Sequence, residues 1–122
     1  MSVREKGNYY ELKACQYLEL KGYKIIETNF RTRWAEIDII ARDKNYIAFV
    51  EVKGRRKNSL VSGFEAIDIN KQKKIEIAAK IYSQKRPSFF YRFDVLSIEE
   101  GNSFRKYDLI KGAFYLNEKR NI

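Results

Sequence analysis

The sequence predicts one α/β domain, in which a mixed β-sheet is flanked by helices and the elements follow the order α-β-β-β-α-β-β. Its 122 residues suit a single domain. Apolar residues make up 44% and aromatic residues 15% of the chain, enough to build a hydrophobic core. No repeat or linker divides the sequence, so we expect one domain over residues 1–122, with its core at about 4–115.

A helix and three strands are predicted in the first half of the chain. Ser2 and Glu5 have the spacing of a capping box, and apolar residues then recur at helical intervals to about Lys21. Gly22 is expected to end this helix. Segments rich in Ile, Val and Phe predict strands over 23–30, 36–42 and 46–53, the last two forming a β-hairpin.

The second half begins with a basic, glycine-bounded segment, which predicts a loop over 54–63. Asn70 is placed to cap a second helix that runs from Lys71 to about Gln84. Two further strands are predicted over 91–98 and 104–110, around a turn at 100–103. The polar tail from Asn117 is expected to fray.

Composition excludes several kinds of catalytic and metal site. The chain has no histidine and one cysteine, so it cannot form a Ser-His-Asp triad, a structural zinc site or an internal disulfide. Hydrolysis would have to use carboxylates, lysine and a hard cation. We expect Cys15, in an apolar helical stretch, to be buried and structural rather than reactive. The reduced cysteine, with no signal sequence or long apolar run, predicts a cytoplasmic protein without membrane segments.

The net charge of +9 is concentrated in residues 31–90. A concentrated basic field favours a polyanionic partner, and nucleic acid is the commonest one inside a cell. Lysines that only keep the protein soluble, or that contact a membrane surface, are the alternatives.

Two acidic residues lie at the centres of the predicted hairpin strands, where burial would favour apolar residues. Side chains alternate along a strand, so Asp38 shares a face with Glu36, and Glu51 shares a face with Lys53. A four-residue loop over 43–46 would place Asp38 opposite Glu51. A shift of one residue would move Glu51 to the other face and separate the two carboxylates.

Two carboxylates at cross-strand distance repel each other unless a cation neutralises them. Mg²⁺, or Mn²⁺, prefers such oxygen ligands, and it can activate a water and stabilise charge on a phosphoryl oxygen. Lys53 could orient that water, help to deprotonate it or hold the phosphate, and Glu11 is a further candidate ligand or base. The alternative is an edge hairpin with one solvated face, in which Lys53 pairs with Glu36.

Two segments, AEIDIIAR at 35–42 and FVEVK at 49–53, resemble the signature of the YraN family of bacterial proteins. The agreement extends over about residues 4–115. This family is similar to archaeal Holliday-junction resolvases of the P-D-(D/E)-x-K nuclease superfamily. The resemblance implies a restriction-endonuclease-like fold and a Mg²⁺ site. Asp38, Glu51 and Lys53 match the catalytic trio of the superfamily. Glu11 matches a helix carboxylate that joins Asp38 and Glu51 at the metal.

The resemblance also implies secondary positions around this site. Gln72 matches a polar helix position near the metal, and Glu36 is an accessory acid of the family signature. Ala35 replaces the usual glycine and Tyr10 replaces a small residue, and we expect their bulk to narrow access to the metal.

Basic side chains flank the acidic strands and open the second helix, where they could follow a nucleic-acid backbone. The candidate nucleic-acid contacts are Arg31, Arg33, Arg55, Arg56, Lys57, Lys71, Gln72 and Lys74. Trp34, with Phe30 and Tyr23, could stack bases, and packing is the alternative for these three rings.

Together these features predict a Mg²⁺-dependent endonuclease that hydrolyses phosphodiesters of double-stranded or branched DNA. Cutting a junction would require a homodimer, because two strands must be cut. Two alternatives belong to other classes. One is a catalytically inactive nucleic-acid-binding module of the same fold, and the other is a protein that docks acidic protein partners through its basic loop.

Overall fold

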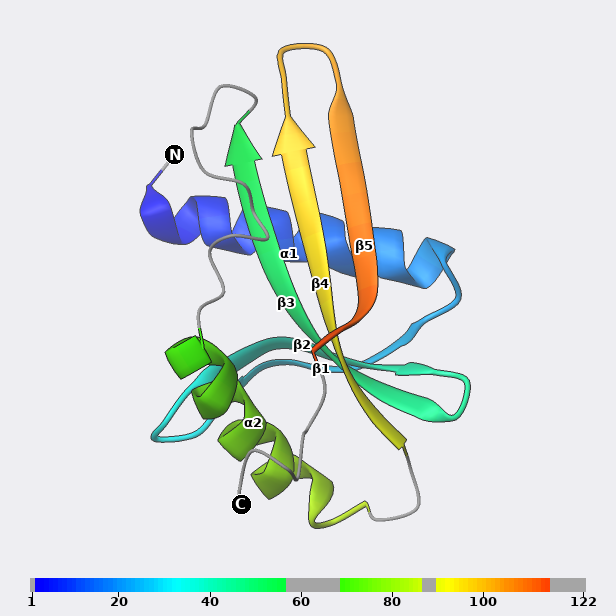
Figure 1. The fold of residues 1–122 in the computed structure, drawn as a ribbon. Helices are drawn as coiled ribbons and strands as arrows, with labels where there is room; N and C mark the ends of the chain where they lie inside the picture. The colour runs from blue at the N-terminus through cyan, green and yellow to red at the C-terminus, as the bar shows by residue number, and fades with distance from the viewer. Residues whose placement is uncertain (1, 57–68, 87–89, 115–122) are drawn as a thin grey trace.

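The computed structural model describes residues 2–56, 69–86 and 90–114. It is an α/β domain with the predicted order of elements (Figure 1). The elements are α1 (Val3–Leu20), β1 (Lys24–Arg31), β2 (Glu36–Asp43), β3 (Tyr46–Arg56), α2 (Ile69–Ser83), β4 (Phe90–Glu100) and β5 (Arg105–Phe114).

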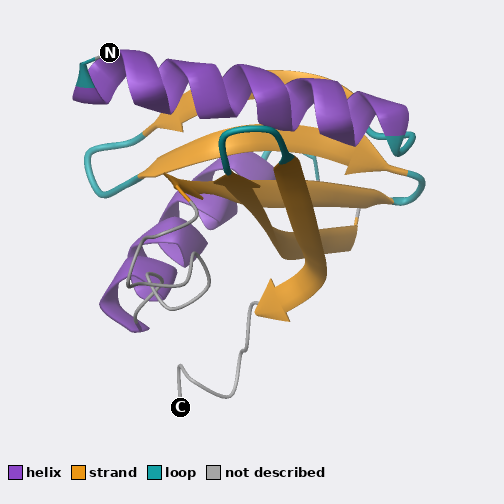
Figure 2. Ribbon diagram, turned by 90° about the horizontal axis from the view of Figure 1, so that it is seen from above, coloured by secondary structure: helices purple, strands orange, loops and turns teal. Residues whose placement is uncertain are grey.

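The five strands form one mixed sheet in the order β1-β2-β3-β4-β5. β3 and β4 are parallel, and the other neighbouring pairs are antiparallel. The chain between the parallel strands includes α2, which lies on the opposite face of the sheet from α1 (Figure 2). This sandwich of two helices around a mixed sheet confirms the predicted fold class.

The two ends of α1 are formed as the sequence predicts. The Ser2 hydroxyl accepts a hydrogen bond from the Glu5 backbone N–H at 3.1 Å and donates one to the Glu5 carboxylate at 3.0 Å. At the other end, Gly22 has a φ of 93°, which favours glycine, and the Tyr23 N–H donates to the Leu18 carbonyl at 2.9 Å. These bonds satisfy backbone groups that a helix end leaves open.

Each face of the sheet carries its own hydrophobic core. The core under α1 includes Ala14, Leu18, Ile39, Val50 and Leu96, and the core under α2 includes Ile37, Phe49, Ile75, Tyr82 and Phe93. Cys15 packs at the edge of the α1 core, where burial raises the pKa of its thiol. Cys15 is thus partly buried rather than fully buried as predicted, and its apolar surroundings agree with a structural role.

Several predicted boundaries were wrong. β3 continues through residues 54–56, predicted as loop, because its parallel pairing with β4 extends to Arg56 and Glu100. α2 begins at Ile69, so Asn70 lies inside the helix rather than at its cap. β4 and β5 are longer than predicted, because they pair along most of their length. The rest of the predicted loop, with Lys57, and the tail from Asn117 lie outside the described residues. Within the described ranges, no helix is both long enough and apolar enough to cross a bilayer.

Candidate active site

The register between β2 and β3 is the one that brings the two central carboxylates together. The strands pair from Asp43 with Tyr46 to Ile39 with Val50. Asp38 and Glu51 are the next residues along each strand. Just beyond this last pair, the Val52 backbone N–H donates a hydrogen bond of 2.8 Å to the Asp38 carboxylate. The side chain of Asp38 therefore bridges β2 to β3 where the backbone pairing ends.

The residues of β2 on either side of Asp38 pack into different hydrophobic cores. Ile39 and Ala41 belong to the core under α1, whereas Ile37 belongs to the core under α2. Regular alternation would place these three odd-numbered residues on one face. The departure falls between Ile37 and Ile39, on either side of Asp38, whose carboxylate reaches β3 through the hydrogen bond from Val52.

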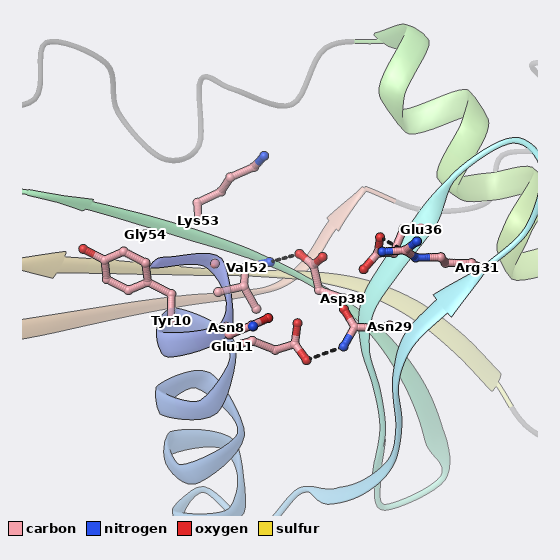
Figure 3. A pocket seen from close by; sticks show the side chains of 11 residues that line it. Asn8, Tyr10, Glu11, Asn29, Arg31, Glu36, Asp38, Val52, Lys53 and Gly54 are labelled. Carbon is pink, nitrogen blue, oxygen red and sulfur yellow. Dashed lines mark hydrogen bonds and ion pairs between the residues drawn. The ribbon is translucent and has the colours of Figure 1, made fainter. Parts of the chain in front are cut away.

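A pocket of about 680 Å³ opens beside Asp38, between the first helix and the first three strands (Figure 3). Both Asp38 and Lys53 line it, as do two other predicted site residues, Glu11 and Glu36. The remaining lining residues are Gly7, Asn8, Tyr10, Asn29, Arg31, Val52 and Gly54. With Arg31, a predicted nucleic-acid contact, five of the sequence-predicted acidic and basic side chains thus share one cavity.

The Asp38 carboxylate carries poorly compensated negative charge. Burial raises the pKa of Asp38 to about 7, and the nearby negative charge of Glu51 acts in the same direction. The hydrogen bond from Val52 and the positive charge of Lys71 lower it only in part. An added cation would stabilise the ionised form of this carboxylate.

The Glu51 carboxylate is buried, with 7% of the residue exposed, and two ammonium groups hold it. The Nζ atoms of Lys71 and Lys53 lie 2.6 and 3.3 Å from its Oε1 atom. Burial and the adjacent positive charge of Lys71 lower the pKa of Lys53. Lys53 therefore pairs with Glu51, and not with Glu36 as the solvated-hairpin alternative predicted.

Glu11 and Glu36 line the pocket through other partners. The Asn29 side-chain amide donates a 2.7 Å hydrogen bond to Glu11, whose pKa is raised mainly by burial. Arg31 Nε lies 3.1 Å from a Glu36 carboxylate oxygen, at the point where β1 and β2 meet the turn that joins them. Figure 3 shows these two pairs on the β1 side of the cavity.

Across the described ranges, no three carboxylate or thiol side chains gather closely enough to hold a metal ion together. Asp38 and Glu51 together offer a pair of hard oxygen donors. Mg²⁺ commonly takes one or two protein carboxylates and fills its remaining positions with water or phosphate oxygens. The pair therefore fits a Mg²⁺ ion, whereas Glu11 is engaged by Asn29.

The basic candidates occupy different surroundings. Arg55 forms a 2.9 Å ion pair with Glu99 of β4, and Lys71 lies in the site on Glu51. Gln72 is half-buried and Lys74 is exposed, both on the first turns of α2. The guanidinium of Arg33 lies over the Trp34 ring. Arg56 ends β3, its side chain is not described, and Lys57 lies outside the described residues.

Sequence reasoning missed three contributions to this site. It assigned Lys71 to the nucleic-acid surface, without its contact with Glu51. It gave Asn29 no role, although a φ of 55° turns its amide toward Glu11, and asparagine tolerates that conformation better than most residues. It also overlooked Gly54, against which the Tyr10 ring packs closely. None of these long-range contacts leaves a local pattern in the sequence.

Comparison with known proteins agrees with the sequence resemblance. The family described as "Uncharacterised protein family UPF0102" matches residues 10–98. A UPF0102 protein of Clostridium botulinum (strain Loch Maree / Type A3) is 42% identical over 118 residues, which cover 93% of this chain and 96% of that protein. A UPF0102 protein of Caldicellulosiruptor saccharolyticus is 41% identical and is covered completely. The predicted YraN resemblance is thereby confirmed, and the chain belongs to the UPF0102 family.

Proposed function

We propose that this protein is a Mg²⁺-dependent nuclease that hydrolyses phosphodiester bonds of DNA. The proposal rests on one observation: Asp38 and Lys53 line one pocket, and Glu51, on the strand next to Asp38, lies close enough to raise the pKa of Asp38 and pairs with Lys53 at 3.3 Å. Ion pairs and hydrogen bonds fix all three groups. The unfavourable charge on Asp38 supports a cation as the missing partner.

The two carboxylates would share one task, and Lys53 and Arg31 would have others. Asp38 and Glu51 would hold the cation through carboxylate oxygens. A Mg²⁺ ion bound there would supply an activated water and neutralise charge on the phosphoryl oxygen. Lys53, the ammonium group that pairs with Glu51 beside the pocket, is suited to orient the attacking water or to hold the phosphate. Arg31, 76% exposed at the pocket margin, is suited to contact an adjacent phosphate.

A cleavage assay tests this proposal. Purified protein is incubated with end-labelled duplex, single-stranded and four-way-junction DNA, in Mg²⁺, Mn²⁺ or chelator. We expect products with at least one substrate, only in the presence of metal. Asp38→Asn and Glu51→Gln should each reduce the rate at least ~100-fold, since each removes a ligand that the reaction requires.

A matched variant separates loss of chemistry from loss of fold. Asp108→Asn makes the same chemical change on an exposed carboxylate of β5 and should cleave like wild type. Binding of labelled DNA to Asp38→Asn should stay within ~3-fold of wild type, because the basic contacts remain. Products that persist unchanged in Asp38→Asn and Glu51→Gln, or that form equally in chelator, would contradict the proposal.

A binding module without turnover is the second candidate, and one observation favours it. The Glu51 carboxylate already has two ammonium partners, so its charge is neutralised without a metal. This candidate predicts salt-sensitive DNA binding and no metal-dependent product from any substrate. It also predicts that Glu51→Gln binds DNA as wild type does, in metal and in chelator alike.

A further inference from the structure

The turn between β1 and β2 presents an exposed tryptophan in a fixed conformation. Trp34 is 50% exposed, and the Arg33 guanidinium lies 4.9 Å from the centre of its ring. The Thr32 hydroxyl accepts hydrogen bonds from the backbone N–H groups of Trp34 and Ala35, and the Thr32 N–H donates to the Ala35 carbonyl at 2.9 Å. This ordered turn holds the indole outward rather than in a core.

The two aromatic residues grouped with Trp34 in the sequence have structural roles instead. Phe30 packs against the core under α2, with its ring edge-on to Tyr82 at 5.3 Å. Tyr23 is buried, and its hydroxyl donates a 2.8 Å hydrogen bond to Asp94. Packing therefore accounts for Phe30 and Tyr23, but it accounts for only half of the Trp34 surface.

This turn is continuous with the rim of the candidate active site. The residues on either side of it, Arg31 and Glu36, both line the pocket (Figure 3). The exposed guanidinium groups of Arg31 and Arg33 add positive charge beside the indole. A ligand that extended from the pocket over this turn would meet an aromatic plane and two cations in succession.

A nucleotide base and its flanking phosphates match that surface. A base stacks on an indole whatever its identity, and guanidinium groups contact the phosphates that flank it. Bases inside a duplex are already stacked on their neighbours, so only an unpaired base is free to cover Trp34. We propose that Trp34 and Arg33 bind an unpaired nucleotide, so that the protein's substrates are DNAs with a single-stranded segment next to the reacting phosphate.

This inference rests on the nucleic-acid specificity of the proposed function, and it can be tested without cleavage. Trp34 is the only tryptophan of the chain, so intrinsic tryptophan emission reports on this turn alone. The full chain is titrated in chelator with an oligothymidylate, a blunt duplex, and the same duplex carrying an unpaired tail. We expect the oligothymidylate and the tailed duplex to quench the emission and to protect it from acrylamide. The blunt duplex should bind without either effect.

Affinities of the variants are then measured by anisotropy of labelled DNA. Trp34→Ala should weaken binding of the tailed duplex by ~5- to 150-fold, and Trp34→Phe by less than ~3-fold, because phenylalanine retains an aromatic face. Blunt-duplex affinity should be the same for all three proteins. Leu20→Ala is the matched control, since it truncates an 86% exposed apolar side chain at the C-terminal end of α1, away from the turn that carries Trp34.

The outcomes distinguish this inference from the nuclease proposal. Quenching by unpaired DNA in a protein that cleaves nothing supports the binding of an unpaired nucleotide at Trp34 and contradicts only catalysis. Emission that stays unchanged while anisotropy shows oligothymidylate bound would overturn the inference, as would equal affinities for Trp34→Ala and wild type. Absence of any DNA binding would overturn both proposals.

Discussion

The ammonium nitrogen of Lys71 lies 2.6 Å from the Oε1 atom of Glu51, and this ion pair joins the first turns of α2 to the centre of β3. Lys53 contacts the same oxygen at 3.3 Å. Glu51 is therefore neutralised by protein groups, whereas Asp38 beside it is not. A cation that binds both carboxylates must compete with Lys71.

We expect Lys71→Met to bind Mn²⁺ or Ca²⁺ ~3- to 10-fold more tightly than wild type, because a competing charge at the Glu51 carboxylate is removed. Isothermal calorimetry of the metal alone measures the change. Lys74→Met removes an exposed charge from the same helix and controls for the general loss of positive charge. Unchanged or weaker metal affinity in Lys71→Met would show that Lys71 does not occupy the cation position.

The raised pKa of Asp38 predicts that this carboxylate destabilises the metal-free fold at neutral and alkaline pH. Its pKa of about 7 in the fold exceeds the ordinary value of 3.8, so the folded protein binds the proton more tightly than the unfolded chain. The stability from that proton is complete below pH ~4 and is lost as the pH rises through about 7.

Asp38→Asn should therefore raise the melting temperature at pH 8, in chelator, by ~3–6 °C, and the gain should shrink at pH 5. The asparagine carbonyl can still accept the hydrogen bond from Val52. Thermal unfolding at both pH values measures the effect, with Asp108→Asn as the exposed control. A gain that is equal at the two pH values would contradict the assignment to Asp38 charge.

Buried Arg92 pairs with the carboxylates of Asp43 on β2 and Asp94 on β4. Its guanidinium donates hydrogen bonds of 2.7 Å to Asp94, which is fully buried, and 2.8 Å to Asp43. Arg92→Gln should cost ~3–5 kcal/mol of unfolding free energy, because both carboxylates lose a charged partner inside the protein. Lys111→Gln should cost less than ~1 kcal/mol, since Lys111 contacts Asp43 at 3.0 Å from a half-exposed position. Denaturant unfolding compares the two variants.

The contacts of Asp43 with Arg92 and Lys111 predict that the fold loses part of its stability in acid. Burial opposes ionisation of Asp43, but hydrogen bonds from Arg92 and Lys111 lower its pKa below 3.8 overall. The stability it contributes is therefore present above pH ~4 and is lost as the pH falls through the lower folded value. Asp43→Asn should destabilise the protein at pH 7 and have a smaller effect at pH 3. An equal effect at both pH values would contradict this explanation.

The Tyr10 ring packs so closely against Gly54, beside the pocket, that it leaves no room for a side chain at this position. A Cβ atom at Gly54 would lie 2.2 Å from the Tyr10 Cγ atom, so the ring must move. Gly54→Ala should cost ~1–3 kcal/mol of unfolding free energy. Gly7→Ala, in α1 with open space around its Cβ position, should instead stabilise the protein by ~0.5–1 kcal/mol. Adding Tyr10→Ala to Gly54→Ala should cost less than the sum of the single changes, and full additivity would exclude the contact.

Local sequence patterns were sufficient to predict much of the fold. In the candidate site, they were sufficient to predict that Asp38 and Glu51 lie close together. The capping box at Ser2 and the glycine at the end of α1 mark that helix by hydrogen bonds a few residues long. The pairing of Asp43 with Tyr46 determines the hairpin register, because each further pair follows from the turn. The approach of Asp38 to Glu51 was therefore predictable from residue spacing.

The sequence by itself determined which elements form, the register of β2 with β3 and the identity of the central carboxylates, since these depend on alternation and turn length within one stretch of chain. Only the tertiary structure decided that Lys71 neutralises Glu51, that Asn29 holds Glu11, and that Trp34 remains half exposed while Tyr23 is buried and Phe30 packs partly buried against a core. Those outcomes depend on how helices pack against the sheet, and residue spacing along the chain does not encode packing between distant segments.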